Sequence, residues 1–259
     1  MELSGSTAVV TGAGSGIGRA IASRLAADGV RVVVNDLDVA AAEASAAEIG
    51  AVAISGDAAS EAGVEALITA AIAELGRIDL YVANAGVGTT HGLDASEDDW
   101  ARSWDVNVMA HVRAARRLVP DWLERGEGRF VVTASAAGLL TMLGDAPYSV
   151  TKHGAVAFAE WLSATYGTRG INVHAICPLA VNTPMYQDSG PLRAVLDLDP
   201  VLDPDAVANA LIEAMDDGRF LVLPHPQVKD YFSYRATDPD RWLRGMRKIQ
   251  NHVDSGPAL

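Results

Sequence analysis

A tyrosine and a lysine stand four residues apart in the stretch Pro147-Tyr148-Ser149-Val150-Thr151-Lys152, within a segment of helical character. On a helix, residues i and i+4 share a face, so the Tyr148 phenol and the Lys152 ammonium would lie side by side. An adjacent cation stabilises a phenolate and moves its pKa from about 10 toward the range where it can act as a base. Two solvated positions on one helix face would show the same spacing, so the rest of the chain must decide.

The chain alternates short apolar segments with segments of helical periodicity. The predicted strands are 7–11, 31–35, 51–55, 78–83, 129–134, 171–176 and 220–223. The predicted helices are 17–27, 39–49, 61–75, 101–123, the segment from Tyr148 to near Gly167, and 204–215. Such alternation requires a parallel sheet with right-handed crossovers and helices on both faces. We therefore predict an α/β fold with a doubly wound parallel sheet of about seven strands.

Composition and charge limit the class of protein and partner. Of the 259 residues, 49% are hydrophobic, which is typical of a globular protein with a sizeable core. The formal net charge of −13 disfavours nucleic acid or an anionic membrane as the main partner. The one cysteine, Cys177, lies in an apolar run and is expected to be a buried thiol in a reducing cytoplasm. No apolar run reaches the roughly 18 residues that span a bilayer, and the chain start lacks a basic region, so a cytoplasmic protein is expected.

A glycine-rich segment follows the first predicted strand and opens the first predicted helix. In that context backbone N–H groups and the positive helix end can hold a phosphate, which predicts a dinucleotide site. The residues expected to form it are Gly12, Ser15, Gly16, Ile17 and Gly18.

An aspartate, Asp36, ends the second predicted strand. A carboxylate at this place accepts hydrogen bonds from ribose hydroxyls and repels a 2′-phosphate, which favours NAD over NADP as the cofactor. No Arg or Lys occupies positions 13–16 or Leu37, where a cation would neutralise the extra phosphate. A surface aspartate in a turn is the alternative interpretation.

Small and polar residues also follow the third and fourth predicted strands, as expected if ligands bind at the carboxyl ends of the sheet. Asp57, with Ala58 beside it, is placed to face an adenine amino group. Asn84, Ala85 and Gly86 leave room for a ribose. Ordinary turn chemistry explains either cluster equally well.

In order and spacing these motifs resemble the short-chain dehydrogenase/reductase superfamily, in its compact single-domain branch. The resemblance covers about residues 3–225 and rests on Thr11-Gly12-x-x-x-Gly16-x-Gly18, Asp57, Asn84-Ala85-Gly86, Asn107, Ser135, Tyr148-x-x-x-Lys152 and Pro178 to Thr183. It implies one Rossmann-type domain over 1–259. Within it, 1–110 would mainly bind the dinucleotide, 111–225 would form the catalytic half with a substrate loop at about 184–203, and 226–259 would form a helical tail.

The resemblance also implies catalytic roles. Tyr148 is expected to be the acid/base, and Lys152 to bind the nicotinamide ribose and lower the pKa of Tyr148. Ser135 is expected to hydrogen-bond the substrate oxygen. Asn107 is expected to hold a water that passes protons from Lys152 to solvent.

The loop expected at the nicotinamide departs from the family pattern at one position. Pro178, Val181 and Thr183 are expected to line the nicotinamide, with Thr183 binding its carboxamide. The family has Pro-Gly at the start of this loop, whereas Leu179 follows Pro178 here. Because leucine does not adopt a positive φ without strain, we expect a shifted loop path.

Two segments are expected to close over the substrate. The first carries Leu139 and Met142 and the second carries Met185 and Tyr186, with Ser135 at the reacting oxygen. They predict an apolar pocket without a dedicated cation, and hence a neutral, lipophilic secondary alcohol or ketone as substrate. Packing of these residues against the protein's own core is an equal alternative.

Three functions are consistent with these motifs. The first is an NAD-dependent alcohol dehydrogenase. The second is a biosynthetic keto-reductase using NADPH, which Asp36 disfavours. The third is a dinucleotide-sensing regulator without turnover, which the intact set of Asn107, Ser135, Tyr148 and Lys152 disfavours. Because members of the resembled family are often tetramers, a homo-oligomer, either a dimer or a tetramer, is expected.

The tail from Lys229 to Lys248 differs in composition, with six basic residues against three acidic ones and interleaved aromatic residues. Such mixtures can indicate nucleic acid binding. On an acidic protein, with helical spacing, they favour an amphipathic helix packed on its own domain or on a neighbouring subunit. The six histidines show no metal-ligand spacing with each other or with Cys177, so no metal is predicted.

Overall fold

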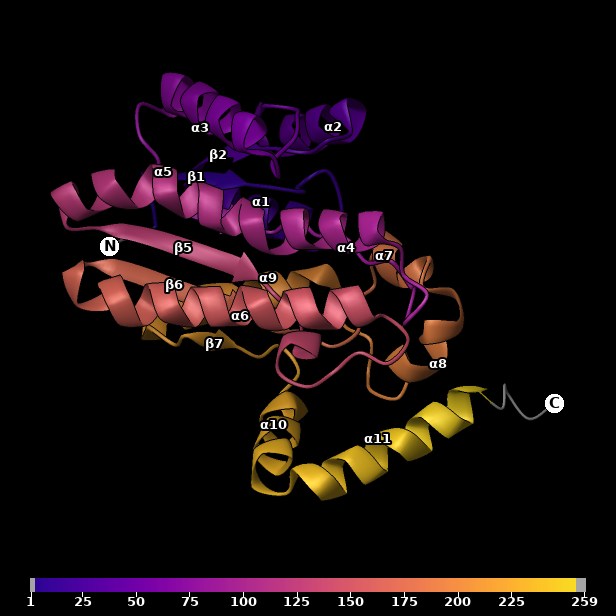
Figure 1. The fold of residues 1–259 in the computed structure, drawn as a ribbon. Coiled ribbons are helices and arrows are strands. Elements are labelled where there is room, and N and C mark those ends of the chain that lie inside the picture. Colours follow the sequence, from indigo (N-terminus) through magenta and orange to yellow (C-terminus); the bar gives the residue numbers. More distant parts are fainter. Residues whose placement is uncertain (1–2, 255–259) are drawn as a thin grey trace.

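The strands form one parallel sheet (Figure 1) in a computed structural model that describes residues 3–254. The order in this seven-stranded sheet is β3-β2-β1-β4-β5-β6-β7. Their bounds are β1 Thr7–Val10, β2 Arg31–Val34, β3 Val52–Ala53, β4 Leu80–Ala83, β5 Gly128–Thr133, β6 Ile171–Ile176 and β7 Leu221–Val222. The predicted doubly wound α/β sheet is confirmed, although β3 has two residues where five were expected.

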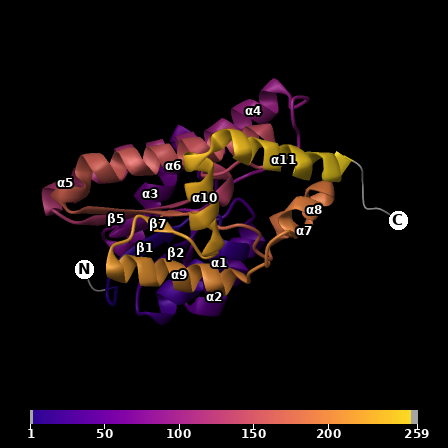
Figure 2. The ribbon, with the colours of Figure 1, turned by 90° about the horizontal axis from the view of Figure 1, so that it is seen from below.

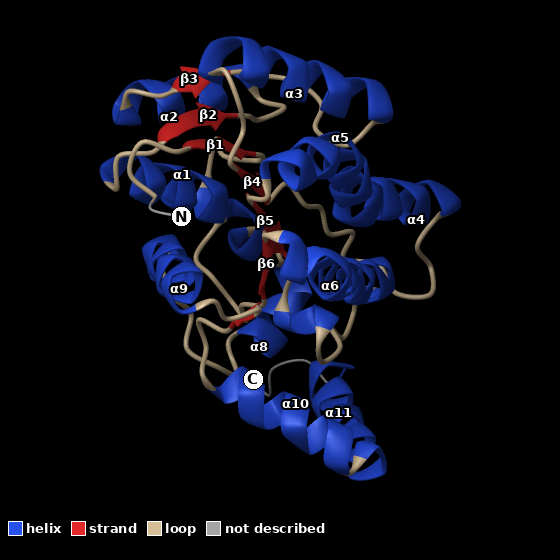
Figure 3. Ribbon diagram, turned by 90° about the vertical axis from the view of Figure 1, so that its left-hand side faces the viewer, coloured by secondary structure: helices blue, strands red, loops and turns tan. Residues whose placement is uncertain are grey.

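Helices cover both faces of the sheet (Figure 3). One face packs against α1 (Gly16–Ala27), α2 (Val39–Ile49) and α9 (Pro204–Asp217). The other packs against α3 (Glu61–Leu75), α5 (Ala110–Arg125) and α6 (Ala146–Tyr166). Because both faces are covered, strands such as β1 and β4 are buried at every position, which explains their continuous apolar sequences.

The strand order reverses at β1, which pairs with β2 on one side and β4 on the other. In open α/β sheets a crevice forms at this switch point, outside the carboxyl ends of the strands. The loop after β1 and the loop after β4 therefore meet at one place.

The helix predicted over 101–123 is interrupted. Instead, α4 (Glu97–Trp104) is followed by a π-helical turn, Asp105–Met109, and then by α5. Ser96 and Asp99 form a capping box that begins α4 upstream of the predicted start. A π-turn inserts about one extra residue, which periodicity does not reveal, and such turns often occur at functional sites.

The tail forms two helices, α10 (Gln227–Thr237) and α11 (Pro239–Asp254), where one amphipathic helix was predicted. They part at Asp238, because a residue before proline is disfavoured in the helical conformation. Figure 2 shows both helices on the side of the molecule that carries β7, with α11 reaching toward α8 (Arg193–Leu196). Residues 1–2 and 255–259 of the expected domain lie outside the described residues. Within 3–254, no helix is long and apolar enough to cross a bilayer.

Candidate active site

A cavity of about 560 Å³ lies at the carboxyl ends of β1 to β6. It brings together most of the residues proposed from the sequence, on both the nucleotide and the catalytic side. Those that line it are Gly12, Ser15, Gly16, Ile17, Asp36, Asp57, Ala58, Asn84, Ala85, Gly86, Ser135, Met142, Tyr148, Lys152, Pro178, Val181, Thr183, Met185 and Tyr186.

Gly18 and Leu139, both proposed site residues, lie outside the cavity lining. A Cβ on Gly18 would come within 2.3 Å of the Gly12 carbonyl oxygen, so this glycine lets α1 pack closely on the first turn. Leu139 is 4% exposed and belongs to the core. Leu140 and Thr141 line the cavity in its place, so the expectation for Leu139 is corrected by one residue.

Asn84 joins the two loops that meet at the switch point. Its Nδ2 donates to the carbonyl oxygens of Thr11 (2.9 Å) and Gly12 (3.1 Å). In return, the Thr11 hydroxyl accepts from the backbone N–H groups of Asn84 and Ala85, each at 3.0 Å. The amide of Asn84 therefore fixes the shape of the glycine-rich turn.

The glycine-rich turn fits a dinucleotide pyrophosphate. The N-terminus of α1 opens at the cavity, no acidic residue occupies its first turn, and the Ser15 side chain makes no capping bond. Gly16 has φ +54°, and a Cβ at this position would come within 3.0 Å of the Thr183 side chain. Any larger residue here would therefore narrow the space between this turn and the loop after β6. Free N–H groups at a positive helix end are suited to a phosphate.

Asp36 lies at the edge of the same turn. Its Oδ2 accepts from the Gly14 N–H at 2.9 Å, and its Oδ1 accepts from the Asp38 N–H at 3.0 Å. Leu37 beside it lines the cavity and is 75% exposed. The carboxylate is thus fixed at the wall of the cavity, and its expected contact with an adenosine ribose stays a prediction.

Asp57 organises its own turn. Its two carboxylate oxygens accept from the N–H groups of Ala59 (2.7 Å) and Ser60 (3.1 Å) at the start of α3. Desolvation alone would raise its pKa, but hydrogen bonds from Ser60 and Ala59 hold the pKa below its usual value. Asp57 therefore makes the ordinary hydrogen bonds of a turn, which was one of the two interpretations of the sequence. It also lines the cavity.

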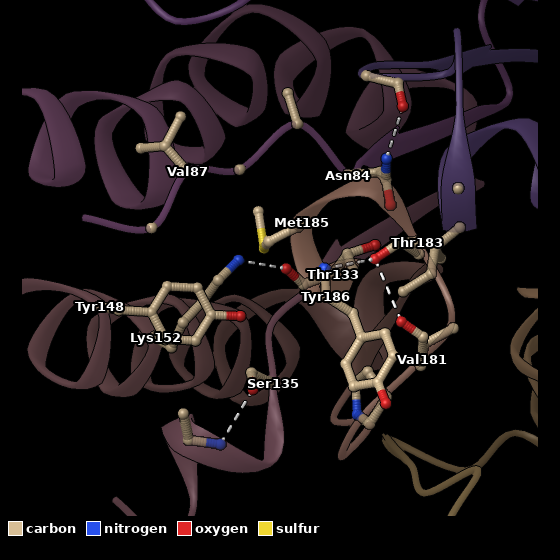
Figure 4. A pocket seen from close by; sticks show the side chains of 18 of the residues that line it. Asn84, Val87, Thr133, Ser135, Tyr148, Lys152, Val181, Thr183, Met185 and Tyr186 are labelled. Atoms are coloured by element: carbon tan, nitrogen blue, oxygen red, sulfur yellow. Dashed lines mark hydrogen bonds between the residues drawn. The ribbon is translucent and has the colours of Figure 1, made fainter. Parts of the chain in front are cut away.

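Lys152 lies beneath Tyr148 on α6 and is 3% exposed. Its Nζ lies 5.5 Å from the Tyr148 ring centroid and donates to the Thr133 carbonyl oxygen at 2.9 Å (Figure 4). Burial lowers the pKa of Lys152 from 10.5 to about 8, while the charge of Cys177 acts in the opposite direction. The ammonium therefore loses its proton at a lower pH than an exposed lysine does.

Tyr148 carries its hydroxyl into the cavity next to the Ser135 side chain (Figure 4). Desolvation by burial raises the pKa of Tyr148, a hydrogen bond with Ser135 opposes the rise, and the charges of Asp145 and Cys177 add to it. The sequence predicted a lowered pKa for Tyr148. The groups of the protein instead raise this pKa, because the effect of burying the phenol is the largest.

Asn107, on the π-helical turn, is fully buried and does not line the cavity. Its Oδ1 accepts from the Val87 N–H at 2.9 Å, and its Nδ2 donates to the Val87 carbonyl (2.9 Å) and to Thr151 Oγ1 (3.0 Å). Asn107 therefore ties the loop after β4 to α6, one residue before Lys152. Its expected role in holding a water stays a prediction.

Asp145 is a site residue that the sequence analysis missed. It is 3% exposed, and its Oδ1 caps α6 by accepting from the Tyr148 N–H at 2.9 Å. The same carboxylate accepts from the Thr89 N–H, the Thr89 hydroxyl and the Thr90 N–H at 2.7, 2.9 and 2.8 Å. An aspartate two residues before Pro147, at a helix start, is a capping signal that would have identified it.

The loop after β6 does not strain Leu179. Within 3–254 the only non-glycine residue with a positive φ is Thr90, so Leu179 takes an ordinary conformation. The Leu179 N–H donates to His225 Nδ1 at 3.2 Å. Further along, the Thr183 hydroxyl donates to the Val181 carbonyl at 3.2 Å and caps the short helix α7 (Pro184–Gln187).

The substrate side of the cavity is largely apolar but not free of charge. Tyr186 donates to Asp197 Oδ1 at 2.5 Å, and the Arg193 guanidinium lies 4.3 Å from the Tyr186 ring centroid. Arg193 and Asp197 lie outside the cavity lining, whereas Arg102 on α4 lines it, a cation that the sequence did not indicate. Other lining residues not named from the sequence include Leu192, Val195, Leu196 and Asp199.

Across the described part of the chain, no group of three or more His, Cys, Asp or Glu residues could hold a metal ion.

The arrangement of nucleotide turn, buried lysine and cavity-facing tyrosine matches a known family. The family model described as short chain dehydrogenase matches residues 6–193. The chain belongs to this family. Short-chain dehydrogenases are nucleotide-binding oxidoreductases that act on hydroxyl groups, and the chain shares their Rossmann-type fold.

Three related proteins illustrate the match. The 1-deoxy-11-beta-hydroxypentalenate dehydrogenase of Streptomyces avermitilis is 36% identical over 252 residues, covering 94% of this chain and 93% of that protein. The 17-beta-hydroxysteroid dehydrogenase 13 of Rattus norvegicus is 30% identical over 259 residues, covering 96% and 85%. A short chain dehydrogenase/reductase from Burkholderia phymatum, solved in complex with NAD, superposes with a TM-score of 0.86 at 29% identity, covering 93% of this chain and 96% of that one.

Proposed function

We propose that this short-chain dehydrogenase is an NAD-dependent enzyme that transfers a hydride between nicotinamide and a lipophilic secondary alcohol or ketone. One observation carries the proposal. Tyr148, Ser135 and Lys152 line the same cavity as the glycine-rich turn and Asp36. A proton-transfer group and a nucleotide-binding turn therefore face one common space, as alcohol oxidation requires.

The residues divide the chemistry between binding and proton transfer. When bound, oxidised nicotinamide supplies the hydride acceptor. The start of α1 would hold the pyrophosphate, and Lys152 would hold the nicotinamide ribose. In oxidation Tyr148 Oη takes the hydroxyl proton of the substrate as the hydride leaves its carbinol carbon, and in reduction both transfers reverse. Ser135 positions the substrate oxygen and stabilises the charge that grows on it.

The raised pKa of Tyr148 and the lowered pKa of Lys152 suit a relay between the two residues. A phenol of raised pKa is protonated at neutral pH, the form needed for reduction. Oxidation needs the phenolate, and a lysine with a pKa of about 8 can exchange protons with its surroundings in the same pH range. Oxidation should therefore be favoured at higher pH.

The preference for NAD over NADP rests on Asp36. Its carboxylate is fixed by the Gly14 and Asp38 N–H groups, and the exposed neighbour is Leu37, not a cation. A 2′-phosphate at this position would lie next to the negative charge of Asp36, with no neighbouring cation at Leu37 to neutralise it. The related structure solved with NAD supports the same preference. An NADPH-dependent keto-reductase is disfavoured for this reason.

The apolar lining supports a lipophilic substrate. Met142, Leu192, Val195 and Leu196 lie on the substrate side. The related dehydrogenases named for a hydroxysteroid and for a hydroxypentalenate also act on alcohols with large carbon skeletons. Arg102 favours a second candidate class, a lipophilic hydroxy acid whose carboxylate contacts this guanidinium.

The remaining features of the proposal rest on the family and on charge. We propose a single domain, with nucleotide binding mainly in 1–110, catalysis in 111–225 and a helical tail after 226. We also propose a cytoplasmic homo-oligomer, dimeric or tetrameric, with neither nucleic acid nor membrane as partner, consistent with the net charge of −13.

The test is a turnover assay with NAD and, separately, NADP, followed by the absorbance of reduced nicotinamide. The alcohols are cyclohexanol, 2-octanol, a 17β-hydroxysteroid and lactate. We expect reduction of NAD with a subset of the three lipophilic alcohols. Rapid turnover of lactate with none of the others would remove the lipophilic class. Tight NAD binding by calorimetry without turnover of any alcohol would favour the dinucleotide-sensing regulator.

A further inference from the structure

The substrate side of the cavity has two walls that are far apart in the sequence. The first wall is the segment 139–142, after Ser135, whose last three residues line the cavity. The second wall is the segment 195–200, which begins within α8. Neither wall contains a strand or a long helix, so something else must fix the distance between them. The tail helix α10 contacts both.

Arg235 links α10 to the first wall. Its Nη1 donates to the Leu139 carbonyl oxygen and to His153 Nε2, the latter at 3.2 Å. Because a guanidinium only donates, His153 Nε2 is the acceptor, and the ring proton lies on Nδ1, which donates to the Ser149 carbonyl at 2.8 Å. The Ser149 hydroxyl in turn bonds to both the N–H and the carbonyl of Met142, each at 2.9 Å. Arg235 therefore holds one end of the wall directly, and α6 holds the other end.

Two residues of α10 link it to the second wall. Asp199 Oδ1 accepts from Gln227 Nε2 and from the Tyr231 hydroxyl, each at 3.1 Å. Asp199 itself lines the cavity. The spacing of Gln227 and Tyr231 is i and i+4, so one face of the helix presents both donors to one carboxylate oxygen.

His225, just before α10, adds a third link. Its Nε2 lies 3.1 Å from the Pro200 carbonyl oxygen, and its Nδ1 accepts from the Leu179 N–H. The ring is 2% exposed, and both nitrogens are used. His225 therefore joins the second wall to the loop that faces the nicotinamide.

The helix α10 is itself anchored in the core. Val228 is fully buried and Tyr231 packs against the same cluster of core residues. By contrast, α11 has no buried residue among its described side chains. Thus α10 can transmit the rigidity of the core to both walls. The attachment of α11 is weaker, because its Trp242 packs against the same cluster but is only partly buried.

We propose that α10 is a clamp that fixes the separation of the two substrate walls, with Arg235 as its positioning residue on the first wall. The clamp explains the basic and aromatic character of this part of the tail: Arg235 and Tyr231 provide its contacts. Its consequence for turnover rests on the proposed function, while its structural consequence does not.

The direct test is amide hydrogen exchange in the full chain carrying Arg235→Met, which keeps an unbranched side chain and removes its donors. The amides of Leu139, Leu140 and Met142 are hydrogen-bonded, so they report on the first wall. We expect their exchange to become about tenfold faster or more, with exchange in the turn 11–18 unchanged. The control is Arg244→Met, at an exposed arginine of α11. Equal exchange of the first wall in the two variants would overturn the clamp.

A second variant addresses the other wall and covers the case in which Arg235→Met does not fold. Tyr231→Phe removes one hydroxyl from Asp199, and we expect faster exchange in 195–200 and little change in 139–142. The reverse pattern, or no change in either segment, would contradict the clamp.

Kinetics with 2-octanol as the probe give the functional readout. For Arg235→Met we expect the KM for 2-octanol to rise about tenfold, kcat to change less, and the Kd for NAD from calorimetry to stay within about twofold. A loss of NAD binding equal to the loss of alcohol binding would indicate general unfolding and would contradict a positioning role. If the wild-type protein oxidises no alcohol, the proposed function fails, and hydrogen exchange still decides on the clamp.

Discussion

The nucleotide side and the substrate side of the cavity are held together in different ways. On the nucleotide side the contacts join turns that directly follow neighbouring strands of the sheet, as between Asn84 and Gly12 or between Asp36 and Gly14. On the substrate side they join distant segments, as between Arg235 and Leu139. The order of the strands brings the turns of the nucleotide side together, whereas the substrate-side contacts depend on where the tail helix α10 packs.

This difference has a consequence for mutation. Substitutions on the substrate side should alter alcohol turnover and leave NAD binding nearly intact, and substitutions near Asp36 should do the reverse. Tyr148 lies in the first turn of α6 and Asp145 caps this helix, and substitutions of these two residues should have the largest effects.

Replacing the acid/base residue should have the largest effect. Tyr148→Phe removes the proton acceptor, and we expect kcat to fall at least about 1000-fold because general base catalysis is lost. The Kd for NAD, measured by calorimetry, should stay within about threefold. A variant with a near-normal rate would remove Tyr148 from its proposed role, and a lost affinity for NAD would show that the two sides are not separable.

Asp145→Ala should give the next largest effect. The substitution removes the cap of α6 and three bonds to Thr89 and Thr90, so we expect kcat/KM to fall about 100-fold and the free energy of unfolding to fall by about 2–4 kcal/mol. Thermal or denaturant unfolding and steady-state kinetics provide the two measurements.

The matched control for Asp145 is Asp38→Ala. Asp38 also caps a helix, but it makes a single capping bond, to the Ala41 N–H at 3.1 Å, and it is exposed. We expect Asp38→Ala to lower the free energy of unfolding by about 1 kcal/mol and to leave kcat/KM nearly unchanged. Equal kinetic losses in the two variants would show that Asp145 acts only as a helix cap.

The cofactor preference should respond to the nucleotide side alone. Asp36→Ala combined with Leu37→Arg removes the repulsion of a 2′-phosphate and adds a cation, so we expect kcat/KM to shift toward NADP by roughly tenfold or more. The KM for 2-octanol should not change. An unaltered cofactor preference would mean that Asp36 does not contact the ribose.

A smaller effect, on stability, comes from Lys152. Its folded-state pKa is lowered to about 8 from 10.5, so the folded protein binds this proton less tightly than the unfolded chain does. The destabilisation is absent above pH 10.5, appears as the pH falls from 10.5 toward 8, and is complete below that. Lys152→Met removes it, so we expect a Tm higher by roughly 3 °C or more at neutral pH, with the gain disappearing at high pH. A lower Tm at neutral pH would contradict the burial of a costly ammonium.

The sequence was informative about the fold and the nucleotide side for a physical reason. Strands buried on both faces require continuous apolar runs, and the turn after β1 requires small residues, as the tight packing at Gly18 shows. Both requirements can therefore be recognised from the residue types of a short segment. The order of the strands and the placement of Asp36 and Asn84 at the cavity then follow from the rules of parallel sheets.

The substrate side could not be predicted to the same depth. Leu139 lies in a short turn after Ser135. No periodicity of the sequence shows which side chain of this turn faces the cavity. The contacts of Arg235 and His225 with Leu139 and Leu179 come from α10 and the segment before it, and no rule of strand order places this tail. Asp145 is different, because its capping position was visible in the sequence.

The most direct test of hydride transfer uses 2-octanol carrying deuterium on its carbinol carbon, with NAD and the wild-type protein. The products are the ketone and the reduced cofactor, and mass spectrometry locates the label. We predict that the deuterium appears in the reduced nicotinamide and that Tyr148→Phe forms almost none of it. Reduced cofactor without the label, or NAD bound tightly and never reduced by any of the lipophilic alcohols, would contradict the proposed function.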